Sequence, residues 1–264
     1  MLISRDKLQH WLDHFYGYGS WDAKFWFVGY EDGGGDLPEE VADKINWFYE
    51  KHGVSNDQLC DIRDLYKNVA VYLEGPKAGV FNTRFDYRFG DKAIQHGIWK
   101  NLIAFMHGYE NRKVPDLLAF QKKKFGINEA LISLYPLPSP HNHAWYYSWL
   151  DMPSMPFLKS RSLYEDHVYE QRINALLSRI KKHNPEVVLM YGMNNINTLK
   201  KSFQSAFPDV DFKSVKAEKL VTPQYHKAEI DGTLLIITTQ IPTLRHGRIE
   251  TGFEWAKFGQ ILGS

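Results

Sequence analysis

The sequence predicts an α/β fold, a three-layer α/β/α sandwich with a mostly parallel central sheet. Two observations lead to this prediction: short apolar runs typical of buried strands recur along the chain, and segments with helical periodicity separate them. Strands that alternate with helices favour parallel pairing through right-handed crossovers. Because no internal repeat or domain boundary is visible, we expect a single domain over residues 1–264.

The predicted strands are short segments rich in β-branched, aromatic and aliphatic residues, each ending close to a Gly or Pro. They cover residues 24–30, 130–135, 186–191 and 234–239. The second should stop at Pro136, because proline cannot donate to a sheet ladder. Residues 212–230 add one or two edge strands.

The predicted helices are recognised by apolar spacing and by end signals. Ser4 suits an N-cap, Pro38 suits a first helical turn, and Asp91 begins a segment with one apolar stripe. The helices are expected over residues 4–16, 38–51, 56–73, 91–107, 115–124, 163–182, 194–206 and 250–262.

The amino-acid composition limits the kinds of protein that this chain can be. The net charge of +1 over 264 residues excludes a polybasic binder, although a local basic groove is compatible with it. The single cysteine, Cys60, excludes an internal disulfide and fits a reducing compartment. Neither a signal region nor a membrane-spanning run is visible. We expect a monomeric cytoplasmic protein with no membrane partner.

The first predicted strand breaks into an acidic, glycine-rich loop, Val28-Gly-Tyr-Glu-Asp-Gly-Gly-Gly35. Glycines let the backbone approach a ligand and point its N–H groups at it. A tight turn with solvated carboxylates is the simpler interpretation, but the whole cluster after a buried strand favours a site at the carboxyl edge of the sheet. In a parallel sheet, the loops after Val28, Tyr135, Tyr191 and Thr239 all emerge at that edge.

Taken together, these loops resemble the uracil-DNA glycosylase superfamily. Besides the acidic loop, the matching segments are Ser133-Leu-Tyr-Pro-Leu-Pro138, Pro185-Glu-Val-Val-Leu-Met-Tyr-Gly192 and Thr239-Gln-Ile-Pro-Thr-Leu-Arg-His246. The resemblance covers about residues 24–262, and it is carried by the order and spacing of the set. It implies the fold of that superfamily and a cofactor-free hydrolase that cleaves the N-glycosidic bond of an extruded DNA base.

The resemblance also implies catalytic residues. Glu31, with Asp32 in reserve, falls where the family orients water and steadies the positive charge on the sugar. Ile241 replaces the family's histidine that stabilises the departing base, and His246 is the candidate to compensate for it. Ser133 stands in place of the family's base-reading asparagine. The sequence therefore leaves open which base is the substrate, and whether catalysis remains.

Further residues are expected to contact DNA. Leu244 and Arg245 fall where the family inserts a wedge into the base stack. Thr243 and Arg248 flank them, and the arginines suit phosphate contacts. The sequence leaves open whether the DNA substrate is single- or double-stranded. The expected base pocket consists of Gly29, Tyr30, Gly33, Ser133, Tyr135 and Pro136.

Other interpretations stay open at this point. His141 and His143 have spacing suited to a metal, but with no third ligand visible we expect no metal. Trp145, Tyr146, Tyr147 and Trp149 could stack on a base or form a hydrophobic lid. The whole chain could also be a non-catalytic nucleic-acid or nucleoside binder of the same fold, or an unrelated α/β enzyme acting on a phosphorylated metabolite.

Overall fold

A seven-stranded mixed sheet forms the centre of the computed structural model, which describes residues 3–35, 37–52, 58–140, 145–150, 152–243 and 253–264. The strand order is β1-β3-β2-β4-β7-β6-β5. The strands are β1 (Gly17–Gly19), β2 (Phe25–Gly33), β3 (Ala130–Ser139), β4 (Val187–Tyr191), β5 (Lys213–Val215), β6 (Tyr225–Ile230) and β7 (Thr233–Ile237).

The central strands β3, β2, β4 and β7 are parallel to one another, whereas the outer strands β1, β6 and β5 pair antiparallel. The predicted α/β class and parallel core are therefore confirmed, and the two edge strands in residues 212–230 are present. Because β2, β3, β4 and β7 run the same way, their carboxyl ends meet at one edge of the sheet.

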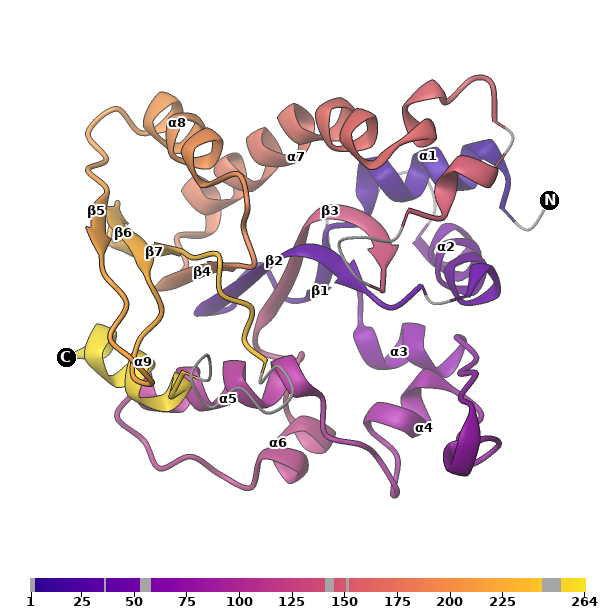
Figure 1. Cartoon of the computed structure of the whole chain (residues 1–264), viewed down its shortest axis with the longest axis horizontal. Helices are drawn as coiled ribbons and strands as arrows, with labels where there is room; N and C mark the ends of the chain where they lie inside the picture. Colours follow the sequence, from indigo (N-terminus) through magenta and orange to yellow (C-terminus); the bar gives the residue numbers. More distant parts are fainter. Residues whose placement is uncertain (1–2, 36, 53–57, 141–144, 151, 244–252) are drawn as a thin grey trace.

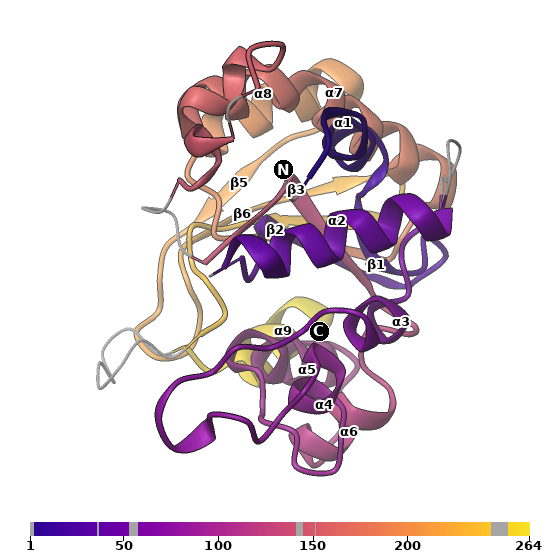
Figure 2. The ribbon, with the colours of Figure 1, turned by 90° about the vertical axis from the view of Figure 1, so that its right-hand side faces the viewer.

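Helices cover both faces of the sheet (Figure 1). On one side lie α1 (Arg5–His14), α7 (Arg161–His183) and α8 (Ile196–Ala206), and on the other lie α5 (Gly97–Tyr109), α6 (Leu117–Lys123) and α9 (Trp255–Gly263). Figure 2 shows the same two layers from the side. The remaining helical segments are α2 (Pro38–His52), α3 (Ile62–Lys67), α4 (Arg84–Arg88), η1 (Gly75–Lys77), η2 (Tyr147–Trp149) and η3 (Pro156–Lys159).

Local signals explain most helix ends. The Ser4 side chain accepts a hydrogen bond from the backbone N–H of Lys7, and α2 begins at Pro38 as expected. Close helix packing needs glycine in α9: a Cβ on Gly259 would lie 2.0 Å from the carbonyl oxygen of Phe105 in α5. This close contact packs α9 directly against α5, and α5 supplies one wall of the site described below.

Four predictions about elements were wrong. β2 continues past Tyr30 to Gly33, so the two carboxylates lie in the strand and not in the loop that was expected there. β3 continues through Pro136 to Ser139. Because β1 pairs only with residues 130–132, no strand on that side needs an N–H from Pro136, and proline is tolerated there. The helix predicted over residues 91–107 is α5, and it begins at Gly97 instead of Asp91 because the side chain of His96 caps it. The helix predicted over residues 56–73 is α3, which is shorter than expected because Asp61 caps it and it ends at Lys67.

Candidate functional site

A cavity of about 260 Å³ lies where the carboxyl ends of the parallel strands approach α3, α4 and α5. The ends of β2, β3 and β4 all contribute to its walls, whereas no described residue of the segment after β7 does. Its walls mix charged, hydroxyl and aromatic side chains. The lining residues are Tyr18, Glu31, Asp32, Gly33, Gly34, Tyr66, Arg84, Arg88, His96, Ile98, Trp99, Leu131, Ile132, Ser133, Pro140 and Tyr191.

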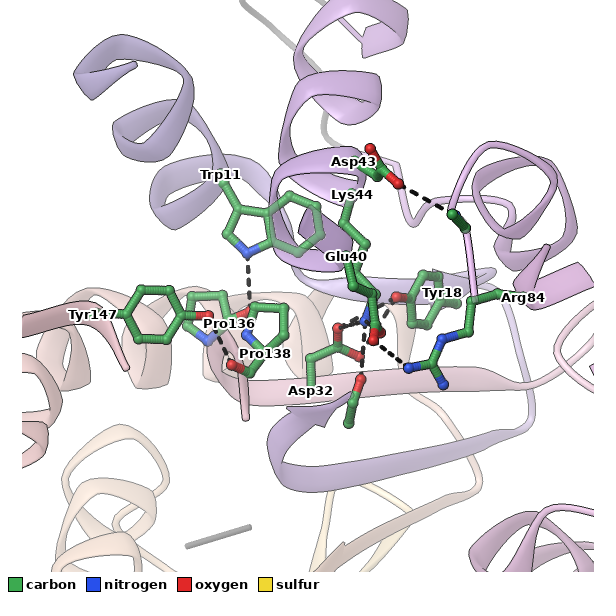
Figure 3. Close-up of polar contacts among 12 residues, drawn as sticks. Trp11, Tyr18, Asp32, Glu40, Asp43, Lys44, Arg84, Pro136, Pro138 and Tyr147 are labelled. Carbon is green, nitrogen blue, oxygen red and sulfur yellow. Dashed lines mark hydrogen bonds and ion pairs between the residues drawn. The ribbon is translucent and has the colours of Figure 1, made fainter. Parts of the chain in front are cut away.

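Asp32 is held by a buried lysine from α2 (Figure 3). The Nζ of Lys44, whose side chain is 1% exposed, donates to Asp32 Oδ2 over 3.0 Å and to the carbonyl oxygen of Gly33 over 2.9 Å. The Tyr18 hydroxyl donates to the same carboxylate at 3.5 Å. Burial raises the pKa of the Asp32 carboxyl, and the Lys44 ammonium opposes this shift. Burial alone would lower the pKa of Lys44, but the charges of Asp32, Tyr66 and Glu40 together outweigh burial and raise that pKa.

A second ion pair extends this network. Glu40, one turn before Lys44 on α2, pairs with Arg84 at the start of α4 and lies 3.9 Å from Lys44. Gly34 passes over the pair with φ near +100°, and a Cβ there would lie 2.5 Å from Glu40 Oε1. A residue with a side chain would therefore be both strained and obstructed, which explains the need for glycine in the loop.

Glu31 faces a different cation. Its carboxylate pairs with Arg161, the first residue of α7, and its side chain is only 7% exposed. Arg161 also donates to Ser139 Oγ over 3.0 Å at the end of β3. Glu31 is therefore anchored at the cavity wall instead of extending into bulk solvent, and each of the two neighbouring carboxylates has its own positive partner.

His96 brings a neutral imidazole to the cavity. Its Nδ1 accepts hydrogen bonds from the backbone N–H groups of Ile98 and Trp99, at 3.2 and 3.3 Å, and so caps α5. Burial lowers the pKa of His96 well below its ordinary value, and the charges of Arg88 and Arg84 lower it further. Because Nδ1 is an acceptor, the proton of the neutral ring is on Nε2.

Gln121 of α6 fixes the loop that carries Arg88 and His96. This residue is fully buried, and its Nε2 donates to the carbonyl oxygens of Arg88 and Ile94. Its Oε1 accepts from the backbone N–H of His96 and from the side chain of Gln95, both at 2.8 Å. Four hydrogen bonds from one side chain therefore hold residues 88–96 against the cavity.

The structure brings together four of the residues expected at the site: Glu31, Asp32, Gly33 and Ser133 line the cavity. Gly29 lies beneath Tyr191, whose hydroxyl oxygen would be 2.9 Å from a Cβ at that position.

The other expected pocket residues point elsewhere. The rings of Tyr30 and Tyr135 pack together with centroids 4.8 Å apart, and Tyr30 interacts with Glu165 of α7. The carbonyl oxygen of Pro136 accepts from the indole of Trp11 (Figure 3). None of these three is among the described residues that line the cavity.

The segment after β7 packs against α5. Asn101 of α5 donates to the carbonyl oxygen of Pro242 over 2.8 Å, and a Cβ on Gly97 would lie 3.4 Å from the Thr243 hydroxyl. Ile241 packs over Gly192 at the end of β4. The predicted residues Leu244, Arg245, His246 and Arg248 lie outside the described residues, as do His141 and His143.

Two of the aromatic residues after β3 pack into the protein. The Tyr147 hydroxyl donates to the carbonyl oxygen of Pro138, and the Trp145 indole donates to that of Leu158. Trp145 also packs against Tyr164 of α7, with ring centroids 5.1 Å apart. These contacts favour the hydrophobic lid over base stacking for Trp145 and Tyr147.

Sequence reasoning missed Lys44, Arg84, Arg88, His96 and Gln121. One local signal was present, since Thr83-Arg-Phe-Asp86 has the spacing of a capping box and forms one at the start of α4. It would have located α4 and hence Arg84 and Arg88. The others lie on helices or loops as isolated polar residues, a pattern typical of solvated surfaces.

In the described part of the chain, no helix combines the length and apolarity needed to cross a bilayer, and no group of three or more His, Cys, Asp or Glu side chains is placed to hold a metal. No protein-family model and no curated protein matches the chain.

Proposed function

We propose that this protein is a DNA glycosylase-like hydrolase, which takes an extruded base into the cavity and cleaves its N-glycosidic bond. The observation that carries the proposal is the cavity itself, which has two anchored carboxylates, Glu31 and Asp32, on its wall. The resemblance of the loops to the uracil-DNA glycosylase superfamily supports the same function, as does a parallel sheet whose site lies at its carboxyl edge.

The size of the cavity suits one base. Its volume of about 260 Å³ lies just below the range of roughly 300–1,000 Å³ that is typical of small-molecule sites. The aromatic wall made by Trp99 and His96, whose rings stack with centroids 4.5 Å apart, offers an apolar surface to a flat ring. A dinucleotide cofactor would need more room.

In the proposed reaction, a carboxylate positions water and stabilises the positive charge that develops on the sugar. Glu31 is our first candidate, and Arg161 pairs with its carboxylate. Asp32 is the second, and Lys44 pairs with it. Thr243 and the residues after it would contact the DNA backbone and fill the space left by the base.

The test is excision from oligonucleotides that carry a panel of damaged bases, with abasic sites detected by alkaline cleavage. We expect Glu31→Gln to lower the rate by about 10²- to 10⁴-fold while DNA binding persists. Glu31→Gln is a cleaner variant than Asp32→Asn, because the partner of Asp32 is more deeply buried. Glu74→Gln, at an exposed position, is the matched control. Unchanged excision by Glu31→Gln would remove Glu31 from the mechanism.

The alternative is a non-catalytic binder of nucleic acid or nucleosides. The observation that favours it is Ile241, an apolar side chain packed over Gly192 at the position where the resembling family has a hydrogen-bonding histidine. DNA binding without abasic product from any lesion would support this alternative. No affinity for DNA at low salt would instead favour an enzyme acting on a small phosphorylated metabolite, and DNA binding that weakens as salt rises would disfavour it.

A further inference from the structure

The groups that the cavity leaves available to a ligand are mainly hydrogen-bond donors. Its carboxylates are already neutralised, Glu31 by Arg161 and Asp32 by Lys44. Arg88 differs from these cations, because no carboxylate in the described residues lies within ion-pair distance of its guanidinium. A ligand in this cavity therefore meets one positive group whose charge the protein has not balanced.

The Arg88 side chain is held in place but not saturated. Its Nη1 donates to the carbonyl oxygen of Ile94 over 3.3 Å, and its guanidinium lies 4.3 Å from the ring centroid of Tyr87. Gln121 holds the Arg88 backbone through a 2.8 Å hydrogen bond. Among the described residues, none accepts a hydrogen bond from Nε or Nη2, so these N–H groups remain for a ligand, and such a planar fork matches two adjacent acceptors.

His96 adds a donor that does not depend on charge. Because its Nδ1 caps α5, the neutral ring carries its proton on Nε2. The stack on Trp99 and the hydrogen bond from its backbone N–H to Gln121 fix the orientation of the ring. The hydroxyl of Ser133, also on the cavity wall, can donate or accept.

We propose that the cavity selects a 6-oxopurine, a base that presents the adjacent acceptors O6 and N7, with Arg88 and His96 as the specificity-determining residues. Arginine contacts this pair of acceptors with two parallel hydrogen bonds. A 6-aminopurine places an N–H₂ group at the same edge, where it would face donors and leave them unsatisfied. The inference rests on the proposed function, since it takes the ligand to be a base.

The experiment measures equilibrium binding of free hypoxanthine, adenine, uracil and cytosine to the full chain by calorimetry. We expect hypoxanthine to bind about 5- to 150-fold more tightly than adenine, the range for one bidentate base contact. Arg88→Met should reduce this preference to less than about twofold. The His96→Asn variant should weaken hypoxanthine binding. Asparagine is chosen because its side chain is also a good N-cap for α5. Lys92→Met, an exposed change on the same loop, is the matched control and should leave the preference intact.

Equal binding of hypoxanthine and adenine, or absence of binding by both, would overturn the inference. A stronger preference for uracil over cytosine than for hypoxanthine over adenine would also overturn it, and would indicate a pyrimidine pocket. A preference that survives Arg88→Met in a folded variant, checked by circular dichroism, would remove Arg88 from recognition. Selective binding of hypoxanthine without excision from any oligonucleotide would contradict the proposed hydrolysis and leave the selectivity standing.

Discussion

Replacing Lys44 with methionine tests whether the buried charge network stabilises the site. Methionine preserves most of the side-chain volume but removes the ammonium, so Asp32 loses a partner at 3.0 Å and the carbonyl oxygen of Gly33 loses one at 2.9 Å. Both charged side chains are almost fully buried, at 1% and 7% exposure. Removing one partner of such a pair costs about 3–5 kcal/mol, a large part of the roughly 5–15 kcal/mol that stabilises a typical domain.

The assay is urea unfolding of wild type and Lys44→Met at several pH values, with unchanged m-values as evidence of a comparable transition. Without Lys44, burial and the neighbouring Glu40 raise the pKa of Asp32 in the folded state above its unfolded value. A raised folded pKa contributes stability at low pH that is lost as pH rises through it. The deficit of the variant should therefore be largest at neutral pH and should shrink on acidification.

A double-mutant cycle with Asp32→Asn supplies the control. Because the second change removes the unpaired carboxylate, Lys44→Met should cost less in the Asp32→Asn background than in wild type. A loss below about 1 kcal/mol for Lys44→Met alone, which is the value of an exposed ion pair, would refute the reasoning. A deficit that does not vary with pH would show that Asp32 is not the group left uncompensated.

Two further predictions follow from single residues. Gly33→Ala should change the free energy of unfolding by less than about 0.5 kcal/mol, because no protein atom lies within 4 Å of the added methyl group, but it should weaken hypoxanthine binding since the methyl enters the cavity wall. A variant that binds as wild type does would show that the ligand does not approach Gly33. Burial lowers the pKa values of His10 and His52 in the folded protein. As pH falls, these histidines therefore take up protons in the unfolded chain before they do so in the folded protein, and the free energy of unfolding should decrease below about pH 6.5. Thermal melting at pH 7.5 and 5.5 measures this, and His10→Phe should make the decrease smaller; an equal decrease in wild type and variant would contradict it.

Much of the fold was determined locally and could be predicted. The apolar runs of β2, β3, β4 and β7 are too long and too uniform for an exposed strand, and the helices between them favour parallel pairing. The extension of β3 past Pro136 could not be predicted, because it depends on which neighbour pairs with each side of that strand. The start of α5 was missed for a similar reason, since the fold fixes His96 as its cap.

The sequence by itself determined the acidic and glycine-rich end of β2, because the apolar run, the two carboxylates and the glycines are consecutive there. It also determined that several such ends face the same edge. Only the tertiary structure decided the rest of the site: Lys44 and Gln121, which support the cavity wall, come from separate helices. Arg88 ends α4, and Gln121 holds the segment from Arg88 to His96 in place. Burial gives these side chains their roles, and burial of a polar residue depends on contacts with distant segments, which local periodicity does not record.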